Sequence, residues 1–281
     1  MTDREKSFEL SQSDFNFICQ YTYEIAGIVL NASKKEMVYR RLTRIIRARN
    51  IASFTEYCDL LKSEPEKEKD YFINAITTNL TNFFREQHHF DYMLQHELPK
   101  IIENSLTNYK RLRIWSSASS TGEEPYSIAI TLLEGMKSSL DQWDAKILAT
   151  DIDSDVLSVG KGGVYDNHRI EDVPKKITDK YFHKGIGKNK NKVKVDEKLS
   201  KLITFKQLNL LCDWPMKGPF DIIFCRNVVI YFDKETQQKL FARYYEILAP
   251  GGLLILGHSE NLGAHQVHFE NVGRTIYRKV F

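Results

Sequence analysis

The chain of 281 residues has little of what proteins use, besides a hydrophobic core, to hold a fold together. Its four cysteines have no CxxC or metal-like spacing, so we interpret them as small apolar residues in a reducing compartment. The eight histidines show no metal spacing either, and we expect no metal. No apolar run approaches the roughly 18 residues of a membrane span, and the polar N-terminus carries no secretory signal. We therefore expect a cytoplasmic protein without membrane insertion.

Net charge is also scarce, because 40 basic residues stand against 37 acidic ones and leave only +3. That balance carries no global signature of nucleic-acid binding. The charge is nevertheless uneven along the chain. Residues 34–49 hold seven basic side chains against one acid, and residues 184–201 hold seven lysines against two acids. These two clusters need an explanation of their own.

Hydrophobic periodicity divides the chain into two parts. Up to about residue 80 apolar residues recur at helical spacing, as over residues 15–25, without strand-like alternation. Beyond that point short apolar runs alternate with helical patterns, which predicts a mostly parallel sheet covered by helices. We predict an all-α domain over residues 1–84 and an α/β domain over residues 85–281. Lysines at period two after a pair of glycines predict a small antiparallel β insert over residues 163–205.

The expected strands are, in chain order, Leu112–Trp115, Ile147–Thr150, Leu202–Phe205, Asp221–Cys225 and Leu253–Leu256. The expected helices include Met37–Arg49, one through Phe72 and Leu80, one near His88–Asn104, Pro125–Met136, Asp153–Val159 and Lys234–Leu248.

Ligands of open α/β sheets bind at the carboxyl ends of the strands, so the loop after the first strand is a candidate site. Residues 116–127 are mostly small and contain neither GxGxxG nor a P-loop. Glu123 and Glu124 near its end would repel a pyrophosphate and suit a ligand with positive charge or hydroxyls. Taken alone, the better interpretation is that both acids complement the dipole of the following helix.

The next strands also end in polar residues. Asp151 is a candidate for ribose hydroxyls, whereas Asp153 is more simply a helix N-cap. Asn209 can pair with the edge of an adenine and Leu210 can pack on its face, although an Asx-turn explains Asn209 equally well. The pair Arg226–Asn227 follows the fourth strand, over the centre of the sheet. The DPPY or NPPY motif of enzymes that methylate base amines is absent.

Six motifs in this order and spacing resemble the chemotaxis receptor methyltransferase (CheR) family: TNLTNFFRE, ASSTGEEPYSIAI, ATDID, LNLL, FDIIFCRNVVIYF and GHSEN. The resemblance runs from about Phe15 to the C-terminus. It implies a Rossmann-like sheet that binds S-adenosylmethionine, and methyl transfer to glutamate side chains of membrane chemoreceptors. The implied cofactor-binding residues are Asn79, Thr81, Arg85, Glu124, Asp151, Asn209, Leu210, Arg226 and Asn227.

The chemistry implied by the resemblance needs no general base, because a substrate glutamate of ordinary pKa, about 4.3, is already ionised at neutral pH. We expect Arg85 and Tyr231 to line the reacting centre, with Arg85 pairing a carboxylate and Tyr231 donating a hydrogen bond to the glutamate. The alternatives are an ordinary linker arginine and a core aromatic residue.

The resemblance also implies two contacts with the receptor. Arginines fall on one face of the second helix and predict docking to the acidic helices around the methylation sites; without the resemblance, a solvated helix face is favoured. The insert is expected to hold a C-terminal receptor peptide as an added strand, with a lysine-protected edge strand as the alternative. The docking residues are Arg40, Arg41, Arg44, Arg47, Lys184, Gly185, Gly187 and Lys194.

Two rival functions fit the same chain. One is a methyltransferase acting on nucleic acid, disfavoured because aromatic residues are not interleaved in the basic face. The other is an adaptor that binds S-adenosylmethionine without catalysis, which would show defects in the cofactor loops. We see none, and expect neither a nucleic-acid partner nor a non-catalytic role.

Overall fold

The computed structural model describes residues 8–104 and 110–280. Within them the chain forms two compact units. One runs to Thr78 and also takes in Tyr231–Asp233, and the other comprises Asn79–Ile230 and the chain from Lys234 onward. Each unit is described by itself.

The first unit is helical, in agreement with the periodicity of its sequence. The N-cap Ser11 accepts a hydrogen bond from the Asp14 amide (3.1 Å), and helix α1 ends at Gly27 in the left-handed conformation, φ 67°. Ser53 accepts from the Glu56 amide at the start of α3. The elements are α1 (Gln12–Ala26), η1 (Ala32–Lys34), α2 (Lys35–Ala48), α3 (Phe54–Ser63) and α4 (Pro65–Ile76).

The predicted helix through Phe72 and Leu80 was placed too late in the chain. Helix α4 begins at Pro65, whose fixed φ and missing N–H suit a first helical turn, and it ends at Ile76. Leu80 lies beyond it and is 78% exposed, so it contributes nothing to the core of this unit. That core is built from buried side chains of all four α-helices, among them Phe15, Leu42, Ile46, Tyr57 and Phe72.

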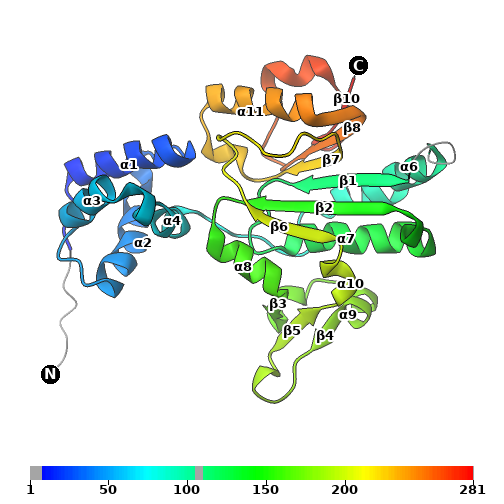
Figure 1. The fold of residues 1–281 in the computed structure, drawn as a ribbon, viewed down its shortest axis with the longest axis horizontal. Helices are drawn as coiled ribbons and strands as arrows, with labels where there is room; N and C mark the ends of the chain where they lie inside the picture. Colours follow the sequence, from blue (N-terminus) through cyan, green and yellow to red (C-terminus); the bar gives the residue numbers. More distant parts are fainter. Residues whose placement is uncertain (1–7, 105–109, 281) are drawn as a thin grey trace. The chain divides into compact units, whose positions relative to one another are not determined.

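The second unit is an α/β fold, as expected from strand–helix alternation (Figure 1). Its main sheet has the order β6-β2-β1-β7-β8-β10-β9 within the described residues. The first five of these strands are parallel, and β10 and β9 add to the edge in antiparallel fashion. The strands are β1 (Arg111–Ser116), β2 (Asp144–Asp151), β6 (Ile203–Gln207), β7 (Phe220–Cys225), β8 (Leu248–Leu256), β9 (Phe269–Gly273) and β10 (Ile276–Lys279).

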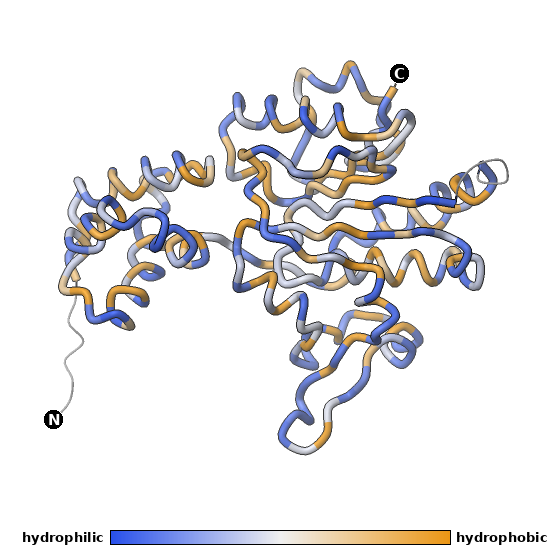
Figure 2. Tube along the Cα trace, in the orientation of Figure 1, coloured by the Kyte–Doolittle hydropathy of each residue, from blue (hydrophilic) through white to orange (hydrophobic). Residues whose placement is uncertain are grey.

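Helices connect the parallel strands, and α7 packs against β2 and β6 while α11 packs against β8. In Figure 2 hydrophobic stretches alternate with hydrophilic ones along the strands of the main sheet, and the core holds Ile114, Ile147, Ile222 and Ile255. The connecting elements are α5 (His88–Tyr92), the π-helical η2 (Met93–Glu97), α6 (Leu98–Asn104), α7 (Glu123–Met136), η4 (Lys137–Gln142), α8 (Ser154–Gly162), η7 (Val229–Tyr231), α11 (Lys234–Ile247) and η8 (Gly263–His268).

The predicted β insert is a separate antiparallel sheet with the order β3-β5-β4. In β5 the lysines alternate with buried valines, so the period-two pattern marks a strand with one buried face. The insert contains β3 (Val164–Asp166), η5 (Asn167–Ile170), α9 (Lys175–Tyr181), β4 (Phe182–Lys184), η6 (Gly187–Asn189), β5 (Lys192–Val195) and α10 (Glu197–Ser200). No helix of the described residues is long and apolar enough to span a membrane.

The parallel pairing brings the carboxyl ends of several strands to one edge. Ser116, the last residue of β1, is paired with Ala149 in β2 and with Phe224 in β7. The residues that follow these strands therefore share one edge of the sheet, which is where an open α/β sheet binds its ligands.

Candidate functional site

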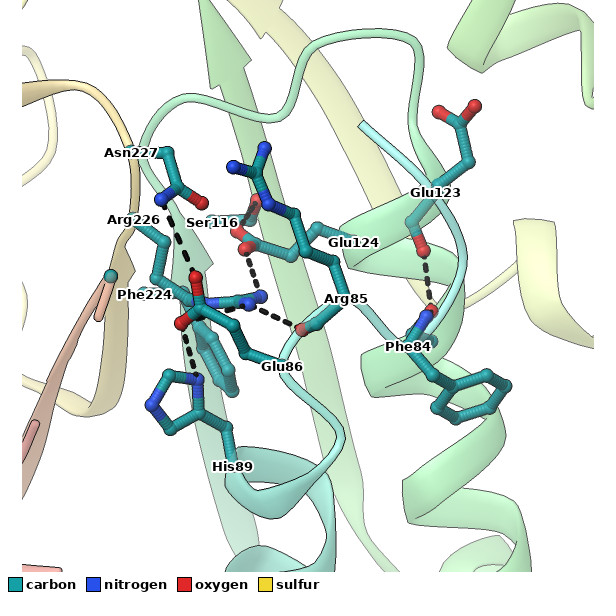
Figure 3. Close-up of polar contacts among 12 residues, drawn as sticks. Phe84, Arg85, Glu86, His89, Ser116, Glu123, Glu124, Phe224, Arg226 and Asn227 are labelled. Atoms are coloured by element: carbon teal, nitrogen blue, oxygen red, sulfur yellow. Dashed lines mark hydrogen bonds and ion pairs between the residues drawn. The ribbon is translucent and has the colours of Figure 1, made fainter. Parts of the chain in front are cut away.

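A buried ion pair between Glu124 and Arg226 lies at this edge (Figure 3). The Arg226 Nη1 donates to Glu124 Oε2 at 2.9 Å, and the Ser116 hydroxyl donates to Glu124 Oε1 at 2.7 Å. Arg226 also donates to the backbone carbonyl of Arg85. The structure therefore joins three of the residues expected at the site through one guanidinium. Burial raises the pKa of Glu124, and Arg226 and Ser116 oppose that shift.

The loop that leads to Glu124 owes its shape to small residues. Gly122 precedes α7 with φ 97°, a conformation that favours glycine. A side chain there would also collide, because a Cβ would lie 2.9 Å from the Gly160 Cα. The neighbouring acid Glu123 is buried and forms an ion pair with Arg169. Glu124 rather than Glu123 is thus the acid that joins the Arg226 cluster.

Glu86 is the second carboxylate on Arg226, and sequence reasoning missed it although it ends the TNLTNFFRE motif. Its Oε2 lies 3.4 Å from Arg226 Nη2, and its Oε1 lies 3.1 Å from His258 Nδ1 and 3.4 Å from Asn227 Nδ2. Burial alone would raise the pKa of Glu86, but Arg226 and His258 lower it to about 2. Glu86 is therefore an ionised carboxylate at neutral pH. Glu86 (φ 57°) and Phe84 (φ 54°) both have positive φ in this loop, which no periodicity in the sequence reveals.

Asp151 ends β2 and holds the small-residue loop in place. It accepts hydrogen bonds from the amides of Ser120 (2.8 Å) and Asp153 (3.1 Å). Burial raises the pKa of Asp151 to about 6. Asp153 is the N-cap of α8, as predicted. Asn79 joins the same group, because it donates to Asp153 Oδ2 (2.7 Å) and its carbonyl accepts from the Ser120 hydroxyl (3.0 Å).

After β6 the structure shows an Asx-turn at Asn209, which was one of the two interpretations that the sequence left open. The side-chain oxygen of Asn209 accepts a hydrogen bond from the Leu211 amide at 3.0 Å, so Asn209 forms an Asx-turn. Leu210 is buried, and its carbonyl accepts from Arg243 and from the indole of Trp214. This turn fixes the chain at the end of a strand next to β2.

Glu260 organises the loop after β7, and it was not among the residues expected at the site. Its two oxygens accept four backbone hydrogen bonds of 2.7 to 3.0 Å. They come from the amides of Asn227, Val228, Val229 and Gly257. The GHSEN motif in which Glu260 stands was noticed, but nothing in it says that four amides converge on its carboxylate.

The side chains of Arg85 and Thr81 are not joined to this cluster within the described residues. The guanidinium of Arg85 donates to the Leu80 carbonyl (2.8 Å) and extends away from Arg226 (Figure 3). Thr81 is half-buried on the same loop. Tyr231 is half-buried and belongs to the helical unit, where its carbonyl accepts from the Val29 amide (2.8 Å).

The expected docking arginines of α2 differ among themselves. Arg40, Arg44 and Arg47 are exposed, while Val38 and Leu42 of the same helix are buried. The fourth, Arg41, is half-buried and donates to carbonyls at the end of α4 and to a neighbouring hydroxyl, namely Ile76 O, Thr77 O and Thr78 Oγ1. Its role at this helix end is structural.

In the insert, β4 is an edge strand, and Lys184 at its end is exposed, as is Lys194 in the central strand β5. Gly185 follows β4 directly, and a Cβ on it would lie 2.1 Å from the Asn189 carbonyl. Gly187 has φ 58°. The tight connection from β4 to β5 thus requires glycine at both positions.

The fold and this edge of the sheet define a Rossmann-like S-adenosylmethionine-dependent methyltransferase. The residues at this edge fit S-adenosylmethionine. The ribose hydroxyls and α-amino group of that ligand need hydrogen-bond acceptors, and the edge carries the carboxylates Glu124 and Asp151. Ser119 Oγ on the intervening loop is buried and has no hydrogen-bond partner within the described residues, so a polar group there remains to be satisfied.

Comparison with known proteins identifies the family. Residues 79–278 match the model of the CheR methyltransferase SAM-binding domain, and residues 13–77 match that of the CheR methyltransferase all-alpha domain. The chain therefore belongs to the CheR methyltransferase family. It is 45% identical over 274 residues to chemotaxis protein methyltransferase 2 of Pseudomonas aeruginosa, covering 97% of this chain and 95% of that protein. It is 41% identical over 279 residues to the chemotaxis protein methyltransferase of Escherichia coli, covering 99% and 93%.

Proposed function

We propose that this protein transfers the methyl group of S-adenosylmethionine to glutamate side chains of chemoreceptors. The names of its relatives support a chemotaxis substrate. The observation that favours a carboxylate as the methyl acceptor is the environment of the Arg85 guanidinium. Within the described residues its guanidinium forms no ion pair, and its one hydrogen bond goes to a backbone carbonyl. A half-buried cation without an anion is suited to receive a substrate carboxylate.

Neighbouring residues hold the loop of Arg85 in place. Arg226 binds the Arg85 carbonyl, and it is itself fixed by Glu124 and Glu86. Arg85 is therefore presented on a backbone whose position a buried ion pair determines. Such preorganisation matters because a displacement transfer depends on aligning the carboxylate oxygen with the methyl carbon and its leaving sulfur.

S-Adenosylmethionine, when bound, supplies a methyl group on a positively charged sulfur. Glu124 and Asp151, with Asn79, Thr81, Asn209, Leu210, Arg226 and Asn227, are the residues we assign to holding it. A substrate glutamate is ionised at neutral pH, so no residue has to remove a proton from it. Burial of the reacting groups favours the transition state, because the attack of a carboxylate on a sulfonium neutralises both charges. We assign Arg85 to the substrate carboxylate, and the hydrogen bond from Tyr231 to the glutamate stays a prediction from the sequence.

For receptor docking we assign the exposed face of α2, with Arg40, Arg44 and Arg47, to the acidic helices of the receptor. Arg41 was expected on this surface, but its guanidinium is engaged at the end of α4, so we leave it out. The edge strand β4, with Lys184, Gly185 and Gly187 at its end and Lys194 beside it, is where a receptor peptide could add as a strand.

The test is incubation of the protein with methyl-labelled S-adenosylmethionine and membranes that contain chemoreceptors, followed by release of base-labile methyl groups. Methyl esters on glutamate are base-labile, so labelled receptor that loses its label in base supports the proposal. Base-stable label on added nucleic acid, or no transfer at all, would contradict it. Arg85→Ala should abolish transfer without unfolding the protein, whereas the control Arg111→Ala, at the opposite end of β1, should leave transfer unchanged.

A further inference from the structure

Three metal-ligating side chains converge within the short segment that follows Arg85. Glu86, His88 and His89 each offer one ligand atom, and these atoms all lie within 4.8 Å of one another. Among the described residues, Glu86 Oε2, His88 Nε2 and His89 Nδ1 are buried and have no hydrogen-bond partner. Buried polar atoms in native proteins are almost always satisfied. Glu86 Oε2 has its ion pair with Arg226, but the two imidazole nitrogens beside it have no hydrogen-bond partner among the described residues, which indicates a missing ligand. A carboxylate oxygen and two imidazole nitrogens can all bind one cation.

The opposite atoms of these side chains are held as they are in metal sites. His89 Nε2 lies 3.2 Å from the Arg274 carbonyl, which can only accept, so this nitrogen carries the proton and donates. It also lies 3.0 Å from Thr275 Oγ1. The lone pair of His89 is therefore on Nδ1, facing Glu86 (Figure 3). A hydrogen bond from the second imidazole nitrogen to a carbonyl is the usual way that proteins orient a ligating histidine.

The spacing suits a small divalent ion. Ligand bonds of about 2.0–2.2 Å at tetrahedral angles separate the ligand atoms by roughly 3.3–3.6 Å. His89 Nδ1 and Glu86 Oε2 are 3.6 Å apart. The ring of the half-buried His88 lies next to that of His89, with centroids 4.1 Å apart, and its ligand atom lies within 4.8 Å of the other two.

The charge of the surroundings permits a cation despite Arg226, whose Nη2 is 3.4 Å from Glu86 Oε2. Two carboxylates, Glu86 and Glu124, contact this one guanidinium, and Glu124 holds it at 2.9 Å. The three groups together leave one carboxylate charge that Arg226 does not balance.

We propose that Glu86, His88 and His89 bind one divalent transition-metal ion, with Zn²⁺ as the first probe. Two imidazoles and one carboxylate favour Zn²⁺ and its neighbours over Mg²⁺ or Ca²⁺, and they leave coordination positions open. This revises the expectation of no metal, which rested on the sequence spacing of the eight histidines. The ion would fix the segment behind Arg85, and the inference stands whether or not the protein methylates glutamate.

The experiment uses the full chain, freed of metal with a chelator and dialysed against Zn²⁺. We expect about one Zn²⁺ per chain by elemental mass spectrometry, and Co²⁺ in its place should give visible absorption typical of nitrogen and oxygen ligands. His88→Ala should weaken binding at least tenfold and remove the Co²⁺ bands. The histidine loses no hydrogen bond within the described residues, so the metal-free variant should retain its circular dichroism and melting temperature.

The matched control is His96→Ala, which removes an exposed histidine one element further along the same helical run. It should bind Zn²⁺ as the parent does. Equal binding by the parent and His88→Ala would overturn the site, because the ion would then reside on surface histidines. Loss of binding in His96→Ala, or no binding in the parent, would overturn it as well. If His88→Ala fails to fold, His88→Gln serves in the same comparison.

Discussion

Two arginine sites, one in each unit of the protein, differ in burial and in their partners. In the α/β unit, Arg226 is buried and surrounded by Glu124, Glu86 and a backbone carbonyl. On α2 of the helical unit, Arg40 and Arg44 are exposed to solvent. A buried charge fixes geometry, because each of its partners is costly to leave unpaired. An exposed cluster of like charges instead creates a field that acts at a distance on an oppositely charged partner. The difference separates a residue that shapes a site from residues that attract a partner.

Removing Arg226 should have the largest effect. Arg226→Met would leave two carboxylates without their cation, and breaking a buried pair in this way destabilises a protein by about 3–5 kcal/mol. Urea unfolding measures the loss. The control is Lys239→Met, which removes an equal charge from an exposed pair with Glu235 and should change the free energy of unfolding by less than about 0.5 kcal/mol. Equal losses in both variants would show that burial does not decide the strength of these pairs.

A change at Glu260 tests whether a buried carboxylate that is held by backbone amides fixes the shape of the site as the Arg226 ion pairs do. Glu260→Gln replaces one accepting oxygen with an NH₂ group that faces backbone donors, so two of four hydrogen bonds are lost. Hydrogen bonds to charged groups contribute about 1.5–3 kcal/mol each, so for two lost bonds we expect a loss of about 3 kcal/mol in unfolding free energy, the lower end of the range, together with weaker binding of S-adenosylmethionine. Exposed Glu270→Gln is the control. Unchanged affinity in Glu260→Gln would mean that the loop after β7 holds its shape without the carboxylate.

The acids at the strand ends were predictable, whereas the residues that hold them were not. Glu124 and Asp151 became candidates because ligands of open α/β sheets bind at the carboxyl ends of the strands, whereas the choice of Glu124 over Glu123 came from the family resemblance. Glu260 and Glu86 act through backbone amides and one guanidinium contributed by distant segments, and no local pattern announces such contacts. Arg41 is a further example, because the sequence does not reveal that backbone carbonyls at the end of α4 lie within reach of its guanidinium.

The same holds for the fold. The α/β class and the insert were correctly predicted from periodicity, which is strong in long apolar runs. The last two strands, β9 and β10, were missed, because each is short and their sequences alternate weakly. Strand β8 begins at Leu248, before the expected start at Leu253, and so includes Gly251 and Gly252. Its pairing with β7 is irregular there, so the glycines are accommodated within the strand.

The exposed arginines should affect rate rather than stability. The double variant Arg40→Glu with Arg44→Glu should lower the rate of receptor methylation about tenfold at low ionic strength, because it reverses a field that steers an acidic partner. The difference from the parent should shrink at high salt. Lys62→Glu with Lys67→Glu, an equal change of charge elsewhere on the same unit, should have less effect. A rate defect that is independent of salt would argue against steering by α2.

The smallest expected effect concerns Asp151. This carboxylate is buried with no cation beside it among the described residues, whereas Glu86 has the cation Arg226. Burial raises the pKa of Asp151 to about 6, above the value of about 3.9 that an aspartate has in an unfolded chain. The stability that this group contributes to the ligand-free protein is therefore fully present below about pH 4 and is lost as the pH rises through 6. A ribose hydroxyl needs the ionised form as acceptor, so affinity for S-adenosylmethionine should change in the opposite direction.

Lowering the pH from 8 to 6 should accordingly halve the affinity, roughly, because half of Asp151 is then protonated. Calorimetric titration at a series of pH values measures this, and urea unfolding of the ligand-free protein over the same range measures the stability. Asp151→Asn cannot titrate, so both pH-dependent differences should flatten in that variant while other carboxylates, Glu86 included, titrate as before. Opposite trends in affinity and stability distinguish protonation of Asp151 from acid unfolding, which lowers both. Identical pH profiles for the parent and Asp151→Asn would show that this carboxylate does not accept from the ligand.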